Sequence, residues 1–122
     1  MSVELVEQAE RVAARAYAPY SNYLVGAVLR ARDGRLFEGV NVENAAYPLG
    51  VCAERSAISA AATAGLRPGD LEGIGITASP CGGCRQWLHE WRFDEVSYRR
   101  ESGDVATMRP ADLLPDTWNL PE

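Results

Sequence analysis

The chain has 122 residues, and its 12 basic residues, all arginine, stand against 17 acidic residues, which gives a formal net charge of −5. The absence of lysine excludes Schiff-base enzymes and phosphate-loop nucleotidases, and the single histidine, His89, excludes a metal site built from several imidazoles. An acidic chain with no basic stripe argues against a nucleic-acid partner, and no apolar stretch approaches the roughly 20 residues of a membrane span.

The secondary structure expected from the sequence alternates between helices and strands. Apolar residues recur at helical spacing from Ser2 onward, so the first helix should end before Pro19. Asp33-Gly34 predicts the turn of a hairpin. The other expected elements are strands over 25–31, 36–42, 71–78, 95–99 and 105–108, and helices over 52–64, 85–91 and from 110 to before 115. This order predicts a single domain, residues 1–122, with one mixed sheet covered by helices on its faces.

Three cysteines, Cys52, Cys81 and Cys84, carry the strongest chemical signal. Their odd number cannot pair completely within one chain, so we expect reduced thiols in a cytoplasmic protein. Cys81 and Cys84 are three positions apart at a helix start, which fits either two ligands of one metal ion or a thioredoxin-like redox pair. Cys52, at another helix start, favours the metal, because three thiolates leave the fourth position of a zinc ion open for catalysis.

Glu54 follows Cys52 by two positions, so its carboxylate can reach the open position of such a site. Three cysteines with a glutamate that is not a ligand form the arrangement of the zinc nucleobase deaminases. His89 lies about 140° around the helix from Cys84, so we expect it to be a surface or packing residue.

Two arginines and an acid–amide pair complete the candidate site. Arg85 directly follows Cys84, and Arg55 directly follows Glu54. Both arginines could offset the thiolate charge by bonding to the sulfurs. Asn41 and Glu43 alternate to the same side of an extended segment. An amide and a carboxylate can together bind vicinal sugar hydroxyls, although the same residues also suit an ordinary polar loop.

Several short segments follow one another in a characteristic order. They are Pro19-Tyr20-Ser21, Val25-Gly26-Ala27, Asn41-Val42-Glu43-Asn44, Tyr47-Pro48-Leu49-Gly50, Cys52-Ala53-Glu54-Arg55, Pro80-Cys81-Gly82 with Cys84-Arg85-Gln86, and Leu113-Leu114-Pro115. No single segment is specific, but the set covers nearly the whole chain. In this order the sequence resembles the small zinc-dependent cytidine deaminase family.

The resemblance implies a three-layer α/β/α sandwich with a mixed five-stranded sheet, in a homotetramer whose sites are shared between subunits. It implies one zinc ion per subunit, held by the three cysteines, with Glu54 moving protons. Arg55, with Gln86 near it, matches the arginine that offsets thiolate charge. The residues that the resemblance places at the substrate are Tyr23, Asn41, Glu43, Ala53, Tyr47 and Trp118.

The expected reaction is hydrolytic deamination of cytidine and deoxycytidine to uridine and deoxyuridine in pyrimidine salvage, with release of ammonia. Glu54 would take a proton from the attacking water and pass protons to N3 and the leaving amino group. A deaminase of a modified cytosine nucleoside, such as a blasticidin-type antibiotic, is the alternative within this chemistry. A thiol redox protein using Cys81 and Cys84 is the alternative from another class. Trp118 departs from the phenylalanine that the family's tail carries.

Overall fold

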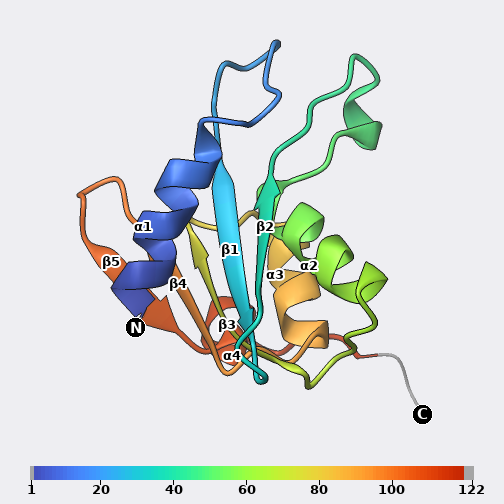
Figure 1. Ribbon diagram of the computed structural model, residues 1–122, viewed down its shortest axis with the longest axis vertical. Coiled ribbons are helices and arrows are strands. Elements are labelled where there is room, and N and C mark those ends of the chain that lie inside the picture. Colours follow the sequence, from blue (N-terminus) through green and yellow to red (C-terminus); the bar gives the residue numbers. More distant parts are fainter. Residues whose placement is uncertain (1, 120–122) are drawn as a thin grey trace.

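A five-stranded sheet forms the middle layer of the structure, a computed structural model that describes residues 2–119 (Figure 1). The strands are β1 (Gly26–Ala31), β2 (Leu36–Val40), β3 (Leu71–Ile76), β4 (Glu95–Arg99) and β5 (Val105–Met108). The helices are α1 (Ser2–Ala13), α2 (Ala53–Thr63), α3 (Gly82–Glu90) and α4 (Pro110–Leu113), with a short 3-10 helix, η1 (Tyr47–Leu49). Among the described residues, no helix has the length and apolar character needed to cross a bilayer.

The strands lie in the order β2-β1-β3-β4-β5, and the sheet is mixed. β3 and β4 are parallel, whereas the other neighbouring pairs are antiparallel. A parallel pair needs a crossover connection, and α3 supplies it. The carboxyl ends of β3 and β4 therefore meet at one edge of the sheet, where the loop that leads into α3 and the β4–β5 turn emerge.

Helices cover both faces of the sheet, as the register of β1 and β2 shows. Gly26 pairs with Val40 and the next residue, Ala27, pairs with Gly39. A β-carbon on Gly26 would lie 2.2 Å from a backbone atom of α1, whereas one on Gly39 would lie 2.3 Å from a backbone atom of α2. Successive residues of a strand point to opposite faces, so α1 and α2 lie on opposite sides (Figure 1). The expected three-layer α/β/α sandwich with a mixed five-stranded sheet is confirmed.

The strands β4 and β5 have the predicted bounds, and β1, β2, β3 and α2 differ from theirs by one or two residues at an end. Two helices differ by more. Helix α1 ends at Ala13 rather than near Pro19, because the backbone N–H of Tyr17 bonds to the carbonyl of Asn41 instead of continuing the helix. Helix α3 begins at Gly82, three residues earlier than predicted, because the sulfur of Cys81 accepts a hydrogen bond from the N–H of Cys84 and caps the first turn. In both cases a contact with another part of the chain or a side-chain cap overrides local propensity.

Candidate metal centre and active site

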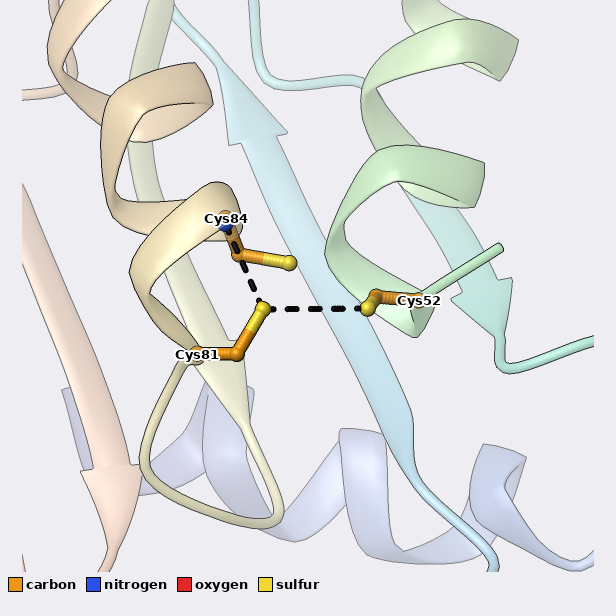
Figure 2. A group of neighbouring side chains, drawn as sticks. All are labelled: Cys52, Cys81 and Cys84. Carbon is orange, nitrogen blue, oxygen red and sulfur yellow. Dashed lines mark hydrogen bonds between the residues drawn. The ribbon is translucent and has the colours of Figure 1, made fainter. Parts of the chain in front are cut away.

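Two helix N-termini bring the three cysteines together. Cys52 is the N-cap of α2, Cys81 is the N-cap of α3, and Cys84 lies in the first turn of α3. Their three sulfurs lie within 4.8 Å of one another, and the three side chains point toward a common centre (Figure 2). Both helices direct partial positive charge from their N-terminal N–H groups to this centre, which favours thiolates there.

The spacing of the sulfurs suits a tetrahedral metal ion. Zinc binds thiolate sulfur at about 2.3 Å, so two sulfurs on one tetrahedral ion lie about 3.8 Å apart. The Sγ atoms of Cys52 and Cys81 are separated by 3.9 Å. Three such donors leave the fourth position of the ion open, which is the pattern of a catalytic rather than a structural site. Cys52 and Cys81 are therefore spaced as two ligands of one zinc ion, and the sulfur of Cys84 lies within 4.8 Å of both.

The cysteine thiols also influence one another. A hydrogen bond from Cys84 lowers the pKa of Cys52 to about 6, and the same contact, with burial, raises the pKa of Cys84. One sulfur thus ionises at the expense of its neighbour, because like charges at this distance disfavour each other. A cation between the sulfurs removes this conflict and lets all three ionise.

Glu54 is the second buried polar feature of the site. Only 4% of its surface is exposed, and it lies in the first turn of α2, two residues after Cys52. Burial raises the pKa of its carboxyl group, with the negative charge on Cys52 adding to the effect. A raised pKa makes the carboxylate a stronger base than an exposed one, which suits the role of a general acid–base.

The two arginines beside the ligands have different surroundings. Arg55 Nη2 lies 4.0 Å from the sulfur of Cys81, as expected, and its Nε has no hydrogen-bond partner among the described residues. Arg85 instead donates its hydrogen bonds to Pro80, Ser79 and Leu113, so the expectation that it could bond to the sulfurs is not met within the described part of the chain.

Gln86 and His89 follow the candidate ligand Cys84 along α3. Gln86 is two residues beyond the buried Cys84, about 200° around α3, where it lines a shallow hollow with Trp87, Glu90 and Trp91. His89 Nε2 is paired with the side-chain oxygen of Asn119 at 2.9 Å. Within residues 2–119, the group of side chains able to hold a metal contains only the three cysteines, so the prediction that His89 is not a ligand is confirmed there.

A cavity of about 810 Å³ opens beside the cysteines and Glu54. Tyr23, Asn41 and Ala53 line it, so three of the residues predicted to contact substrate lie around one space. Asn41 is firmly oriented: its Oδ1 accepts from the N–H of Val25 at 2.9 Å, and its Nδ2 donates to the carbonyl of Tyr23 at 2.8 Å. An amide has two lone pairs and two N–H bonds, so one of each stays available to a hydroxyl group in the cavity.

The other predicted substrate residues lie elsewhere in this single chain. Glu43 accepts hydrogen bonds from the N–H groups of Tyr20 and Ser21 and from the Ser21 hydroxyl, which lower the pKa of its carboxyl group. It lines a separate cavity of about 280 Å³ together with Tyr47. Tyr47, the first residue of η1, is 81% exposed, and Trp118, which follows α4 near the end of the described residues, is 67% exposed.

The sequence reasoning missed one wall of the main cavity. Thr77, Ala78 and Ser79 follow β3, residues 100–102 follow β4, and both segments line the cavity. The signal was available in the topology, because ligands bind at the carboxyl ends of parallel strands in α/β sheets. The predicted strands 71–78 and 95–99, if paired in parallel, would have placed both segments at one edge.

Comparisons with known proteins agree with this geometry. The family model of the cytidine and deoxycytidylate deaminase zinc-binding region matches residues 2–100. The chain is 37% identical to a cytidine deaminase from Sporosarcina psychrophila, over 98% of this chain and 93% of the relative. It is 40% identical to a cytidine deaminase from Mycobacterium tuberculosis, over 92% of this chain and 85% of the relative.

A crystal structure of cytidine deaminase from Burkholderia pseudomallei superposes with a TM-score of 0.89 at 42% sequence identity, covering 97% of this chain and 99% of the other. The family model spans the sulfur cluster and the strands β1 to β4. The chain therefore belongs to the cytidine and deoxycytidylate deaminase family that carries this zinc-binding region.

Proposed function

We propose that the protein is a zinc-dependent cytidine deaminase that converts cytidine and deoxycytidine to uridine and deoxyuridine and releases ammonia. The observation that carries the proposal is the buried carboxylate of Glu54, in one cavity with Cys52 and Cys81. A redox protein would use two of the three thiols, so that function would give no role to the third cysteine or to the buried Glu54. The relatives named above are themselves cytidine deaminases.

The proposed roles follow from the chemistry of the groups. Cys52, Cys81 and Cys84 would hold one zinc ion, which would supply Lewis-acid activation of water at neutral pH. Glu54 would accept a proton from the attacking water and deliver protons to N3 of the cytosine ring and to the departing amino group. The raised pKa of Glu54 supports this role, because the group must hold a proton between the two steps. Arg55 offsets part of the thiolate charge.

The cavity supports a free nucleoside as substrate. Its volume of about 810 Å³ falls within the range of about 300–1,000 Å³ that holds small ligands. Asn41 offers a donor and an acceptor to a ribose hydroxyl, Tyr23 an aromatic ring beside the base, and Ala53 its backbone. A polynucleotide is disfavoured, because the chain is acidic.

A homotetramer with shared sites is part of the proposal. Two neighbouring loops carry large exposed apolar side chains at the end of the molecule where the site lies (Figure 1). These side chains are Tyr17, Tyr20, Tyr23, Leu24, Val42, Tyr47, Leu49 and Val51. Exposed apolar side chains gathered on two neighbouring loops are typical of a surface that another protein covers. In an assembly, Glu43, Tyr47 and Trp118 would complete cavities formed with a neighbouring subunit, in a cytoplasmic salvage enzyme with reduced thiols.

The fall in ultraviolet absorbance after cytidine is added to the purified, zinc-loaded protein tests the proposal. We expect turnover of cytidine and deoxycytidine, loss of turnover after treatment with a zinc chelator, and recovery when zinc is returned. Sedimentation of the same sample should give a mass about four times that of one chain. Turnover of blasticidin S without turnover of cytidine would replace the proposed substrate, and zinc-loaded protein inert toward both would refute the function.

A further inference from the structure

Cys81 is the cysteine of the cluster with the least support from the fold. It is exposed, whereas Cys84 is fully buried and Cys52 is partly buried. It also lies at the end of the loop that joins β3 to α3, whereas Cys84 lies within the helix. The position of its sulfur therefore depends on what fixes the backbone of the preceding residues.

Arg85 is the side chain that fixes this loop. Its Nε donates to the carbonyl of Pro80 at 2.9 Å and its Nη2 donates to the hydroxyl of Ser79 at 3.1 Å. The Pro80 carbonyl belongs to the peptide bond that enters Cys81, so its orientation sets the direction in which Cys81 leaves the loop. The third bond runs from Nη1 to the carbonyl of Leu113 at 2.9 Å.

The bond to Leu113 connects the loop to a distant part of the chain. Leu113 is buried and ends α4, where carbonyl groups lack partners within the helix. The guanidinium of Arg85 is half-buried between the loop and this helix end, and its planar fork can address three acceptors in different directions at once. A lysine ammonium or a glutamine amide at this position could not reproduce that set of bonds.

We propose that Arg85 is a positioning residue of the metal centre, which holds Cys81 in its ligating position by tying the 79–80 loop to α4. The inference rests on the proposed zinc site, and goes beyond it by giving Arg85 a role distinct from that of Arg55. Arg55 approaches a sulfur directly, whereas Arg85 acts through the backbone that carries the sulfur. Loss of an outer partner of a metal ligand typically weakens metal binding by about 10–100-fold.

The test compares Arg85→Gln and Arg85→Lys with the wild-type protein and with a control variant, Arg67→Gln. Arg67 also donates its side-chain hydrogen bonds to backbone carbonyls, those of Ala62 and Leu66, but at the end of α2 away from Cys52. Two readouts are independent of turnover. One is the rate at which zinc passes to a coloured chelator, and the other is the visible absorption of the cobalt-loaded protein, which reports ligand geometry.

We expect Arg85→Gln to release zinc at least about tenfold faster and to change the cobalt spectrum. Arg85→Lys should lie between it and the wild type, because it keeps the charge but not the fork. Arg67→Gln should match the wild type in both readouts. If Arg85→Gln does not fold, Arg85→Lys and Ser79→Ala, which removes a single acceptor, carry the same test with smaller expected effects.

Unchanged zinc release and an unchanged cobalt spectrum in the Arg85 variants would overturn the inference. So would an equal acceleration in Arg67→Gln, because the effect would then reflect general loss of stability. A wild-type protein that binds no zinc would overturn the proposed function and this inference with it. Zinc-loaded wild type with unchanged Arg85 variants would overturn this inference alone.

Discussion

The sulfurs of Cys52 and Cys81 lie 3.9 Å apart, although 29 positions separate the two residues in the chain. Each residue caps a different helix, so the meeting point is fixed by how α2 and α3 are placed on the same sheet. A metal ion at this point would join the two helices, and its binding free energy would then add to the stability of the fold.

Replacement of Cys81 by serine should remove zinc from the purified protein. A serine hydroxyl is not a ligand that zinc favours, and two thiolates alone leave the site incomplete. We expect affinity to fall by more than the 10–100-fold that the loss of an outer partner costs, with a lower melting temperature in the presence of zinc. Metal analysis after dialysis measures the loss. His89→Ala is the control and should keep one zinc per chain; loss of zinc from it would contradict the three-cysteine site.

Replacement of Glu54 by glutamine should abolish most turnover and leave the metal in place. Glutamine keeps the shape of the side chain but cannot carry a proton between water and the ring, so we expect kcat to fall by at least about 10²–10⁴-fold. The melting temperature should not fall, because a neutral amide costs less to bury than a carboxylate. Initial rates with zinc-loaded protein measure the effect.

The matched control for Glu54 is Glu101→Gln, at the exposed rim of the same cavity. It removes an equal charge from the cavity wall without touching the proton path, so its rate should stay within a few-fold of the wild type. A Glu54→Gln rate near the wild-type value, or an equal loss in Glu101→Gln, would show that Glu54 is not the proton carrier.

The metal-binding cluster could be predicted from the sequence because its parts are local and rare. Cys81 and Cys84 share one helix turn, Glu54 follows Cys52 by two positions, and the chain has no fourth cysteine and a single histidine. Cys52 and Cys81 meet because the fold places the starts of two helices at the same edge of the sheet, and few topologies do so. The strands β4 and β5 could also be predicted from the sequence, because clear turn signals bound each of them.

The features that escaped prediction depend on contacts between distant segments. Because Arg85 follows Cys84 in the sequence, we expected that it could bond to a sulfur. In the structure its partners include the carbonyl of Leu113, 28 positions away. The early start of α3 likewise depends on the Cys81 sulfur acting as a cap, which outweighs the poor helix propensity of two glycines. Asn41 and Glu43 alternate along the chain, but the Tyr20–Ser21 turn engages Glu43 and leaves it in a separate cavity.

Replacement of Asn41 by alanine should weaken substrate binding more than it slows chemistry. The variant leaves the N–H of Val25 and the carbonyl of Tyr23 without their partner and removes the groups that face the cavity. A substrate hydroxyl group left without its partner costs about 1–3 kcal/mol of binding, so we expect kcat/KM for cytidine to fall about 10–100-fold, mainly through KM.

A substrate without sugar hydroxyls separates direct contact from loop distortion at Asn41. With 2′,3′-dideoxycytidine, the substitution should lower kcat/KM much less than with cytidine. The dideoxy substrate lacks the hydroxyl group that Asn41 would bind, so the wild-type protein gains nothing from Asn41 either. An equal loss with both nucleosides would assign Asn41 to holding the 23–25 segment alone.

Two glycines of β3 should respond differently when each is changed to alanine. A β-carbon on Gly75 would lie 2.4 Å from the backbone carbonyl carbon of Leu5 and 2.5 Å from the backbone nitrogen of Val6, so α1 would have to move away from the sheet. We expect Gly75→Ala to lower the free energy of unfolding by about 2–3 kcal/mol or more, the cost of overpacking a tight core.

Gly73→Ala is the matched control on the same face, because its β-carbon would have an ordinary nearest contact of 3.5 Å, with Glu95. Its unfolding free energy should stay within about 0.5 kcal/mol of the wild type. Urea unfolding of both zinc-loaded variants measures the difference, and equal midpoints would show that α1 does not rest on the sheet at Gly75.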